Sequence, residues 1–259
     1  MSKQIDNHCS GLLNELLNGG ISSPNDVPGL LVWLDANDLS SITKDGSNLV
    51  SNWTNKGGSD AATQGTSASQ PVYTASAING KPAINFDPAG TQSFMSIADD
   101  PRYNWTGLHV FAVVQQVTDT AAIATVVGKY NVTGNQREWA LNYTSGRTIQ
   151  GVSSADGTST TVNASTTGAI TVGTNIIADY SWDGTNTQAF KNNGSSSGAV
   201  AATIFNSTAV IMLGGVTAGA TQAFIGYIGE ILIYSGKLST ANKRNVLDYL
   251  SAKWGIVVS

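Results

Sequence analysis

Few side chains in this sequence could move a proton or attack a substrate. The candidates are three glutamates and two histidines: Glu15, Glu138, Glu230, His8 and His109. Glycoside hydrolysis requires two carboxyl groups that flank the scissile bond, yet none of the glutamates has an acidic neighbour two or four residues away. A nucleophilic triad requires a histidine as base, and His109 stands beside Val110 and Phe111 in an apolar segment typical of a strand. We therefore predict no catalytic residues and a protein that is not an enzyme.

Oxygen ligands for calcium are more plentiful than acid–base groups. Several aspartates stand where loops meet predicted strands: Asp35, Asp38, Asp87, Asp99 and Asp100. Calcium prefers such carboxylate ligands, but aspartates at loop ends also cap turns through their own side chains. The sequence therefore leaves calcium open as a cofactor without defining a ligand set. A single cysteine, Cys9, excludes an internal disulfide and argues against a zinc cluster.

Aromatic side chains beside amides could bind a glycan. Tyr103, Asn104 and Trp105 stand together in a loop before a long apolar segment, and Trp182 is a further candidate. An aromatic ring offers a sugar a broad apolar face, and an adjacent amide offers hydrogen bonds. The remaining tryptophans in apolar or alternating segments are expected in the core, namely Trp33, Trp53, Trp139 and Trp254. We predict the glycan site, if one exists, at Tyr103, Asn104 and Trp105.

The composition restricts the partners of the protein. Of the 259 residues, 41% are hydrophobic, enough for a β-sandwich core, and only 12% are charged, about half the usual share. The net charge is −4 and no basic stripe is present, which argues against nucleic-acid binding. No apolar run reaches the length of a membrane span, and the first residues do not read as a signal peptide. We predict synthesis in a cytoplasm, with no nucleic-acid or membrane partner.

The first 27 residues are predicted to form a separate arm. Ser10 can cap a short helix over residues 11–18, and one stripe of that helix carries four leucines: Leu12, Leu13, Leu16 and Leu17. So short a helix is marginal alone in water, so its stripe must pack against something. That surface is either the protein's own sandwich or another chain. A linker with two prolines, residues 21–28, follows the helix.

Residues 28–259 are predicted to form one all-β domain closed by a helix. A segment apolar on both faces, residues 29–35, is expected to be a central strand. Further strands are predicted at residues 49–53, 71–74, 83–86, 93–97, 108–117, 122–128, 138–143, 147–152, 175–182, 187–191, 209–214 and 225–234. Gly-containing turn dipeptides separate several of them and favour antiparallel pairing in a sandwich or barrel. A helix capped by Ser239 is expected to end at Trp254, with Gly255 as its C-terminal cap.

Several segments resemble, in order, the laminin-G-like, concanavalin A-like jelly rolls common in bacterial and bacteriophage proteins. They are residues 28–38 (PGLLVWLDAND), 45–53, 61–64, 70–73, 78–87 (INGKPAINFD) and 229–256 (GEILIYSGKLSTANKRNVLDYLSAKWGI). The resemblance is strongest at both ends and weakest over residues 118–173. It implies a concanavalin A-like jelly-roll β-sandwich, with a short N-terminal helical arm outside it and a C-terminal helix. Such domains include lectins, hydrolases and virion proteins, so the fold does not fix the function.

We predict a non-enzymatic bacteriophage virion protein. The leucine-striped arm, the charge-poor surface and the absence of a signal peptide favour a capsid decoration or head-fibre-like component that is assembled in the host cytoplasm. In that role Leu12, Leu13, Leu16 and Leu17 would dock onto the major capsid protein or another virion protein, with many copies on one particle. The alternative is a carbohydrate-binding adhesin or a module that recognises a host-surface glycan or receptor.

Overall fold

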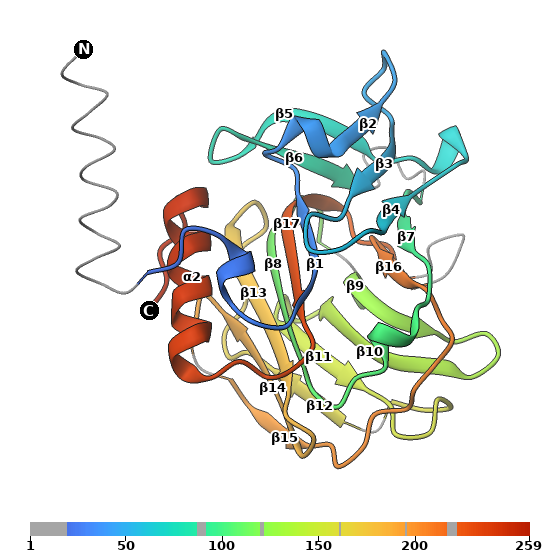
Figure 1. The fold of residues 1–259 in the computed structure, drawn as a ribbon, viewed down its shortest axis with the longest axis vertical. Coiled ribbons are helices and arrows are strands. Elements are labelled where there is room, and N and C mark those ends of the chain that lie inside the picture. Colours follow the sequence, from blue (N-terminus) through green and yellow to red (C-terminus); the bar gives the residue numbers. More distant parts are fainter. Residues whose placement is uncertain (1–19, 87–91, 120–121, 161, 195, 217–221) are drawn as a thin grey trace.

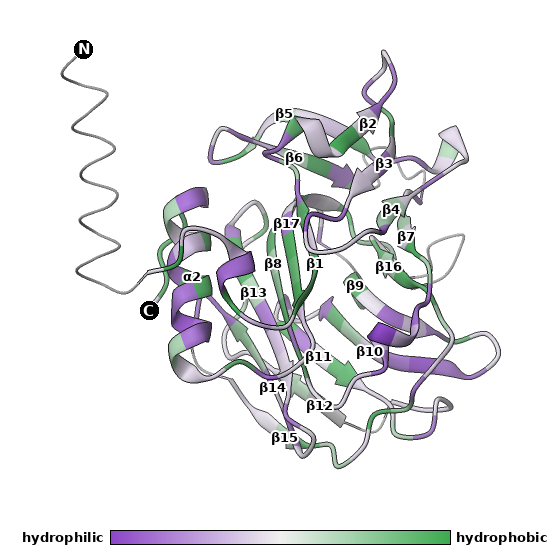
Figure 2. Ribbon diagram, in the orientation of Figure 1, coloured by the Kyte–Doolittle hydropathy of each residue, from purple (hydrophilic) through white to green (hydrophobic). Residues whose placement is uncertain are grey.

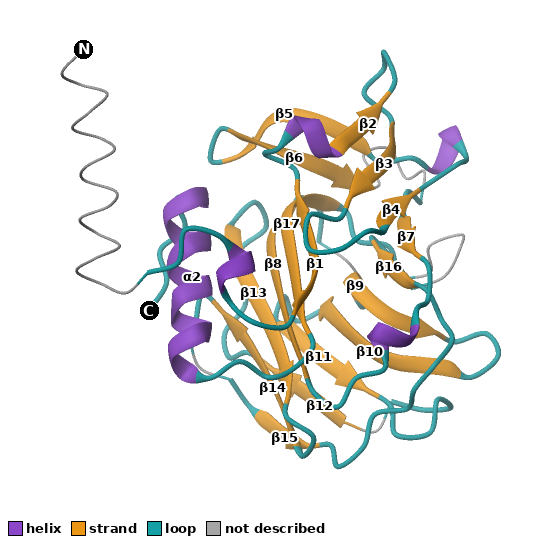
Figure 3. Cartoon of the chain, viewed as in Figure 1, coloured by secondary structure: helices purple, strands orange, loops and turns teal. Residues whose placement is uncertain are grey.

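The computed structural model describes residues 20–86, 92–119, 122–160, 162–194, 196–216 and 222–259, and in these it is a sandwich of two antiparallel sheets (Figure 1). Apart from one long helix and four single 3-10 turns, the described chain is strand and loop (Figure 3). The strands are β1 (Leu30–Asp35), β2 (Ile42–Lys44), β3 (Val50–Thr54), β4 (Ala61–Thr63), β5 (Val72–Ile78), β6 (Lys81–Phe86), β7 (Met95–Ile97), β8 (Leu108–Gln116), β9 (Ala124–Asn131), β10 (Gln136–Tyr143), β11 (Ile149–Ser153), β12 (Val162–Ser165), β13 (Asn175–Trp182), β14 (Asn186–Lys191), β15 (Gly198–Val200), β16 (Ile211–Leu213) and β17 (Gly226–Tyr234). The predicted all-β sandwich is confirmed.

The two sheets have different strand orders. The eight-stranded sheet runs β15-β14-β13-β8-β17-β6-β5, with β1 paired to β17, and the nine-stranded sheet runs β12-β11-β10-β9-β16-β7-β4-β3-β2. Consecutive strands pair toward the ends of both sheets, whereas the pairings β13-β8-β17-β6 and β9-β16-β7-β4 join strands distant in sequence, as in the crossed connections of a jelly roll. The main core lies between the sheets and includes the fully buried Trp53 and Trp139. Strands β8, β17 and β1 are among the most hydrophobic parts of the ribbon (Figure 2).

Helix α2 (Thr240–Trp254) covers the outer face of the eight-stranded sheet. Ser239 caps it by accepting a hydrogen bond from the backbone N–H of Asn242, and Gly255 ends it in the left-handed conformation with φ of 64°. Only glycine adopts that conformation without steric strain, so the C-terminal cap is encoded directly. The buried face of α2 ends in Trp254 and forms a second core with outward side chains of β8 and β13. The predicted helix, both caps and the structural role of Trp254 are confirmed.

A buried ion cluster fastens α2 to the sheet. Glu230 of β17 is 1% exposed and pairs with Lys253 at 2.9 Å; Trp33 Nε1 and Trp254 Nε1 donate hydrogen bonds to its carboxylate at 2.7 and 2.6 Å. Lys253 also contacts Asp35 at 2.8 Å. Burial raises the pKa of the Glu230 carboxyl against the opposing effect of Lys253.

Two expectations about the start of the domain are wrong. Strand β1 pairs only with β17, so it is not a central strand. It is apolar on both faces because Val32 packs into the main core while Trp33 packs into the core under α2. The expected linker also belongs to the domain from Pro24 onward: Val27 is 2% exposed, and the Tyr234 hydroxyl donates to the Pro24 carbonyl at 3.2 Å.

Of the arm predicted over residues 1–27, residues 1–19 lie outside the described residues, and these include the helix expected over residues 11–18 with Leu12, Leu13, Leu16 and Leu17. Their docking role stays a prediction. None of the helices in the described part of the chain is long and apolar enough to cross a membrane.

Candidate functional site

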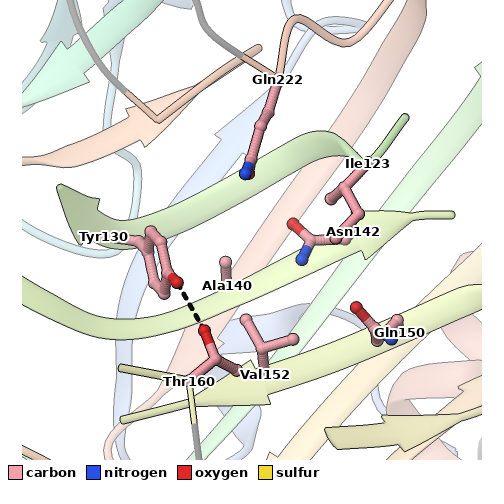
Figure 4. A pocket seen from close by; sticks show the side chains of 8 residues that line it. All are labelled: Ile123, Tyr130, Ala140, Asn142, Gln150, Val152, Thr160 and Gln222. Carbon is pink, nitrogen blue, oxygen red and sulfur yellow. Dashed lines mark hydrogen bonds between the residues drawn. The ribbon is translucent and has the colours of Figure 1, made fainter. Parts of the chain in front are cut away.

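An open pocket of about 190 Å³ lies on the outer face of the nine-stranded sheet (Figure 4). We call it the β9–β11 pocket. Its lining residues come from three adjacent strands and three loops: Ile123, Tyr130, Ala140, Asn142, Gln150, Val152, Thr160 and Gln222. Because α2 covers the outer face of the other sheet, the helix and the pocket are on opposite sides of the sandwich.

Strand alternation places these side chains together. In β10, Trp139 and Leu141 point into the main core, so Ala140 and Asn142 point outward. The register of β10 with β11 then sets Ala140 opposite Val152 and Asn142 opposite Gln150. Four pocket residues are thus fixed by two central strands, which hold them more rigidly than a loop would.

The floor of the pocket is apolar. Ala140 and Val152 are nearly fully buried and form a small cluster with Tyr130 and Val216, separate from the main core. Tyr130 is 8% exposed, so its ring forms a wall of the pocket rather than a free platform. An apolar floor of this kind can receive the C–H face of a ring.

The rim of the pocket carries amides and hydroxyls. The Tyr130 hydroxyl and Thr160 Oγ1 are 2.6 Å apart and share a hydrogen bond. Thr125 Oγ1 lies 2.8 Å from Asn142 Oδ1 and 3.2 Å from Gln222 Oε1, and the Thr125 N–H donates to the Gln222 carbonyl at 2.8 Å. Thr125 therefore orients two amide side chains at the same place, and Figure 4 shows both amides around the same space as the two hydroxyls. Such groups can donate to and accept from a polyol.

A buried ion cluster lies beside the pocket, on β9 and β10. Lys129 is fully buried; its Nζ contacts Glu138 at 2.9 Å, Asp99 at 3.0 Å and the Ser207 carbonyl at 2.6 Å. The Glu138 carboxylate also accepts hydrogen bonds from the N–H and hydroxyl of Ser207, each at 3.0 Å. Burial, opposed by Lys129, raises the pKa of Glu138 to about 7. The cluster ties the segment around Ser207 to the strands that form the pocket.

The raised pKa of Glu138 predicts a specific pH dependence of stability. Between about pH 4.5 and 7 the folded protein keeps a proton that the unfolded chain releases, so the free energy of unfolding falls as the pH rises through that window. Relative to Glu138→Gln, which cannot titrate, the wild type should lose on the order of 2–3 kcal/mol between pH 4.5 and 8. Urea unfolding of both proteins at several pH values measures this. If the free energy of unfolding of the wild type, relative to that of Glu138→Gln, stays constant or rises with pH, then Lys129 has a larger effect than burial on the pKa of Glu138.

The glycan platform expected in the loop before β8 is not an exposed surface. Tyr103 is fully buried, and its hydroxyl donates to Asp60. Trp105 is half-buried and packs against Trp139 with ring centroids 6.2 Å apart. Of the three predicted residues, Asn104 alone is exposed. The loop folds inward because its aromatic rings extend the core. Trp182 is also buried, with its indole N–H bonded to the Ala201 carbonyl. The core positions expected for Trp33, Trp53, Trp139 and Trp254 are confirmed.

The candidate calcium aspartates have other partners. Asp35 and Asp38 pair with Lys56, Asp99 pairs with Lys129, and Asp100 pairs with Arg102 and caps the turn that it begins. Asp87 lies outside the described residues. In the part of the chain that the structure describes, no group of three or more Asp, Glu, His or Cys side chains is placed to hold a metal ion. Calcium binding therefore stays untested.

The side chains considered for catalysis are in structural surroundings. His109 is buried, with Nε2 at 3.2 Å from Asp179 Oδ1, and its Nδ1 accepts a hydrogen bond from the Leu238 N–H. Burial lowers the pKa of this imidazole, which keeps it neutral. Glu138 and Glu230 are each paired with a lysine in separate buried clusters. Glu15 and His8 lie outside the described residues. The two described glutamates and His109 thus have separate sets of partners.

Comparisons with known proteins match this fold to several solved structures. The binding domain of Paraclostridial Mosquitocidal Protein 1 aligns with a TM-score of 0.62 at 9% identity, over 89% of this chain and 53% of that one. The Trypanosoma rangeli sialidase in complex with the inhibitor DANA aligns with a TM-score of 0.59 at 13% identity, over 88% of this chain but only 35% of the sialidase. Domain 4 of AbnA, a GH43 extracellular arabinanase from Geobacillus stearothermophilus, in complex with arabinotriose, aligns at 0.53 and 16% identity, over 85% of this chain and 98% of the domain.

These likenesses support a β-sandwich of the concanavalin-like kind. At such low identity they show the fold alone, and this chain spans only about a third of the sialidase. No family model matches the sequence, and no curated protein matches it. The resemblance to the laminin-G-like family is thus supported in its fold, while its link to bacteriophage proteins has no support from the comparisons.

Proposed function

We propose that this protein is a carbohydrate-binding module and that the β9–β11 pocket holds the sugar. The observation that carries the proposal is the arrangement around Asn142: an apolar floor of Ala140 and Val152, surrounded by amide and hydroxyl groups that converge on one space. Ligand sites commonly combine an apolar lining with a few well-placed polar groups. The sugar's C–H groups would pack on the floor while its hydroxyls exchange hydrogen bonds with Asn142 and Gln150.

The structural neighbours favour the same class of function. One is a binding domain, and another is a domain in complex with arabinotriose that this chain covers over 98% of its length. Because the alignment covers 98% of the AbnA domain, that neighbour is itself a single domain of this fold. A glycan-binding role was the alternative in the sequence analysis, and it now has the better support.

The pocket supports binding rather than hydrolysis. Its eight lining residues include no carboxyl group, whereas a glycosidase of the usual kind needs two at the scissile bond. That the protein is not an enzyme stays a prediction. The virion role also stays a prediction, because its docking leucines lie outside the described residues and no comparison supports a capsid partner.

Glycan binding can be tested with matched asparagine variants. A glycan array with the full chain should identify a ligand. Asn142→Ala and Gln150→Ala should then each weaken binding about tenfold, because each removes about one or two hydrogen bonds to the sugar. Asn104→Ala, which removes an exposed amide in the loop before β8, should leave affinity unchanged. Melting temperatures measured alongside confirm that the variants are folded.

The same experiment separates the two candidate sites. Loss of binding in Asn104→Ala and Trp105→Ala, with Asn142→Ala unaffected, would move the site to the loop that the sequence predicted. An array with no bound glycan would refute the proposed function.

A further inference from the structure

The lining of the β9–β11 pocket is uncharged. Its polar groups are the amides of Asn142, Gln150 and Gln222 and the hydroxyls of Tyr130 and Thr160, and the other three lining residues are apolar. An anionic ligand in a partly buried site needs a cation or several aligned N–H donors to replace its water. We infer, on the basis of the proposed function, that the sugar residue held in this pocket is a neutral one, without a carboxylate or sulfate group.

The basic residues on the same strands are committed elsewhere. The Lys129 ammonium is fully buried and is already paired with Glu138 and Asp99. Arg137, beside Tyr130 in the register of β9 and β10, donates from Nη1 to the carbonyls of Gly157 and Thr158. Lys129 precedes Tyr130 in β9 and Arg137 lies opposite Tyr130 in β10, yet neither cation lines the pocket.

One further cation is in the turn between β10 and β11. Arg147 is about half exposed and lies 3.8 Å from Asp119, which is similarly exposed. It does not line the pocket, and an exposed pair at this distance gives little directional attraction. A carboxylate on the bound sugar would have to compete with Asp119 for Arg147. The turn therefore offers an acidic sugar no net advantage.

The size of the pocket narrows the ligand further. Sites that enclose drug-sized ligands have volumes of about 300–1,000 Å³, whereas this pocket measures about 190 Å³ and is open to solvent. It accommodates one sugar ring, with the remainder of any chain outside. Recognition of the ligand then depends on the hydroxyl pattern of a single neutral sugar unit.

Matched neutral and acidic sugars test this inference. The probes are glucose against glucuronic acid and galactose against galacturonic acid, each pair differing in one hydroxymethyl group replaced by a carboxylate. Calorimetric titration of the full chain should show that the carboxylate weakens binding about tenfold or more. Affinity for the neutral member should change less than about twofold between about 50 and 500 mM NaCl, since no ion pair is screened.

The outcomes distinguish the inference from the proposed function. If an acidic sugar binds as tightly as its neutral partner and Asn142→Ala abolishes that binding, the pocket binds sugar but the inference is overturned. Loss of acidic-sugar binding in Arg147→Ala would overturn it too, by showing that Arg147 reads the charge. If neither the array nor these sugars show binding, the proposed function fails, and the inference fails with it.

Discussion

Replacing Glu230 with alanine is expected to lower the free energy of unfolding by about 3–5 kcal/mol. The Glu230 carboxylate is the shared acceptor for the indole N–H groups of Trp33 and Trp254, for the ammonium of Lys253 and, at 3.3 Å, for the Tyr249 hydroxyl. Its removal leaves the two indole N–H groups buried without their acceptor, while Lys253 keeps only Asp35 as its carboxylate partner, and breaking a buried ion pair from one side in this way is strongly destabilising. Urea unfolding followed by tryptophan fluorescence measures the loss, and also reports on the two indoles involved.

An exposed ion pair of the same helix provides the control. Arg244 and Asp248 pair at 2.8 Å, with each side chain about half exposed. Asp248→Ala should change the free energy of unfolding by less than about 0.5 kcal/mol, because a surface pair of this spacing contributes little. Similar losses in Glu230→Ala and Asp248→Ala would mean that the buried cluster does not hold α2 to the sheet.

The sequence was most informative where local chemistry determines the structure. The Ser239 cap and the left-handed Gly255 set both ends of α2, and the Asn79-Gly80 turn, with φ of 50° and 77°, joins β5 to β6 as a tight hairpin. Among the long strands, β13 was predicted with both of its ends, and β8 and β17 were each predicted to within one residue. In each case a few neighbouring residues carry the whole signal.

Four short strands, β2, β4, β12 and β15, were not predicted. Each has only three or four residues, too few to show an alternating pattern, and each pairs with a longer neighbour. The position of β1 was misjudged for a related reason. A strand that is buried on both faces can lie in the centre of a sheet or near its edge, provided that other layers cover both faces. The sequence pattern does not distinguish these two positions.

The candidate site was missed for a different reason. The outward positions Asn142 and Gln150 follow from the alternation of β10 and β11, which the sequence does show, but their juxtaposition depends on strand register. The approach of Gln222 depends on a loop 80 residues further along the chain. Aromatic residues in a loop, Tyr103 and Trp105, gave the stronger sequence signal, and the fold used them for the core instead.

Gly151 is predicted to be essential both for stability and for the pocket. A Cβ at this position would lie 1.9 Å from Cδ2 of Tyr180, whose ring is fully buried between the sheets. Gly151→Ala should therefore cost about 3 kcal/mol or more in the free energy of unfolding, at or above the upper end for overpacked cores. The same displacement of β11 would shift Gln150 and Val152, the pocket residues on either side of Gly151, so glycan affinity should fall as well.

Two comparisons isolate the steric cause. Gly65→Ala makes the same chemical change where nothing lies within 4 Å of the added Cβ, and it should leave stability equal or raise it slightly by restricting the unfolded chain. In a double-mutant cycle, Tyr180→Ala removes the ring, so the further change Gly151→Ala should then have little effect on the free energy of unfolding. Additive losses in the cycle would show that β11 requires glycine for its backbone and not for the close approach of Tyr180. Strand β11 would then owe its position to its own conformation, and the pocket would not depend on packing from the opposite sheet.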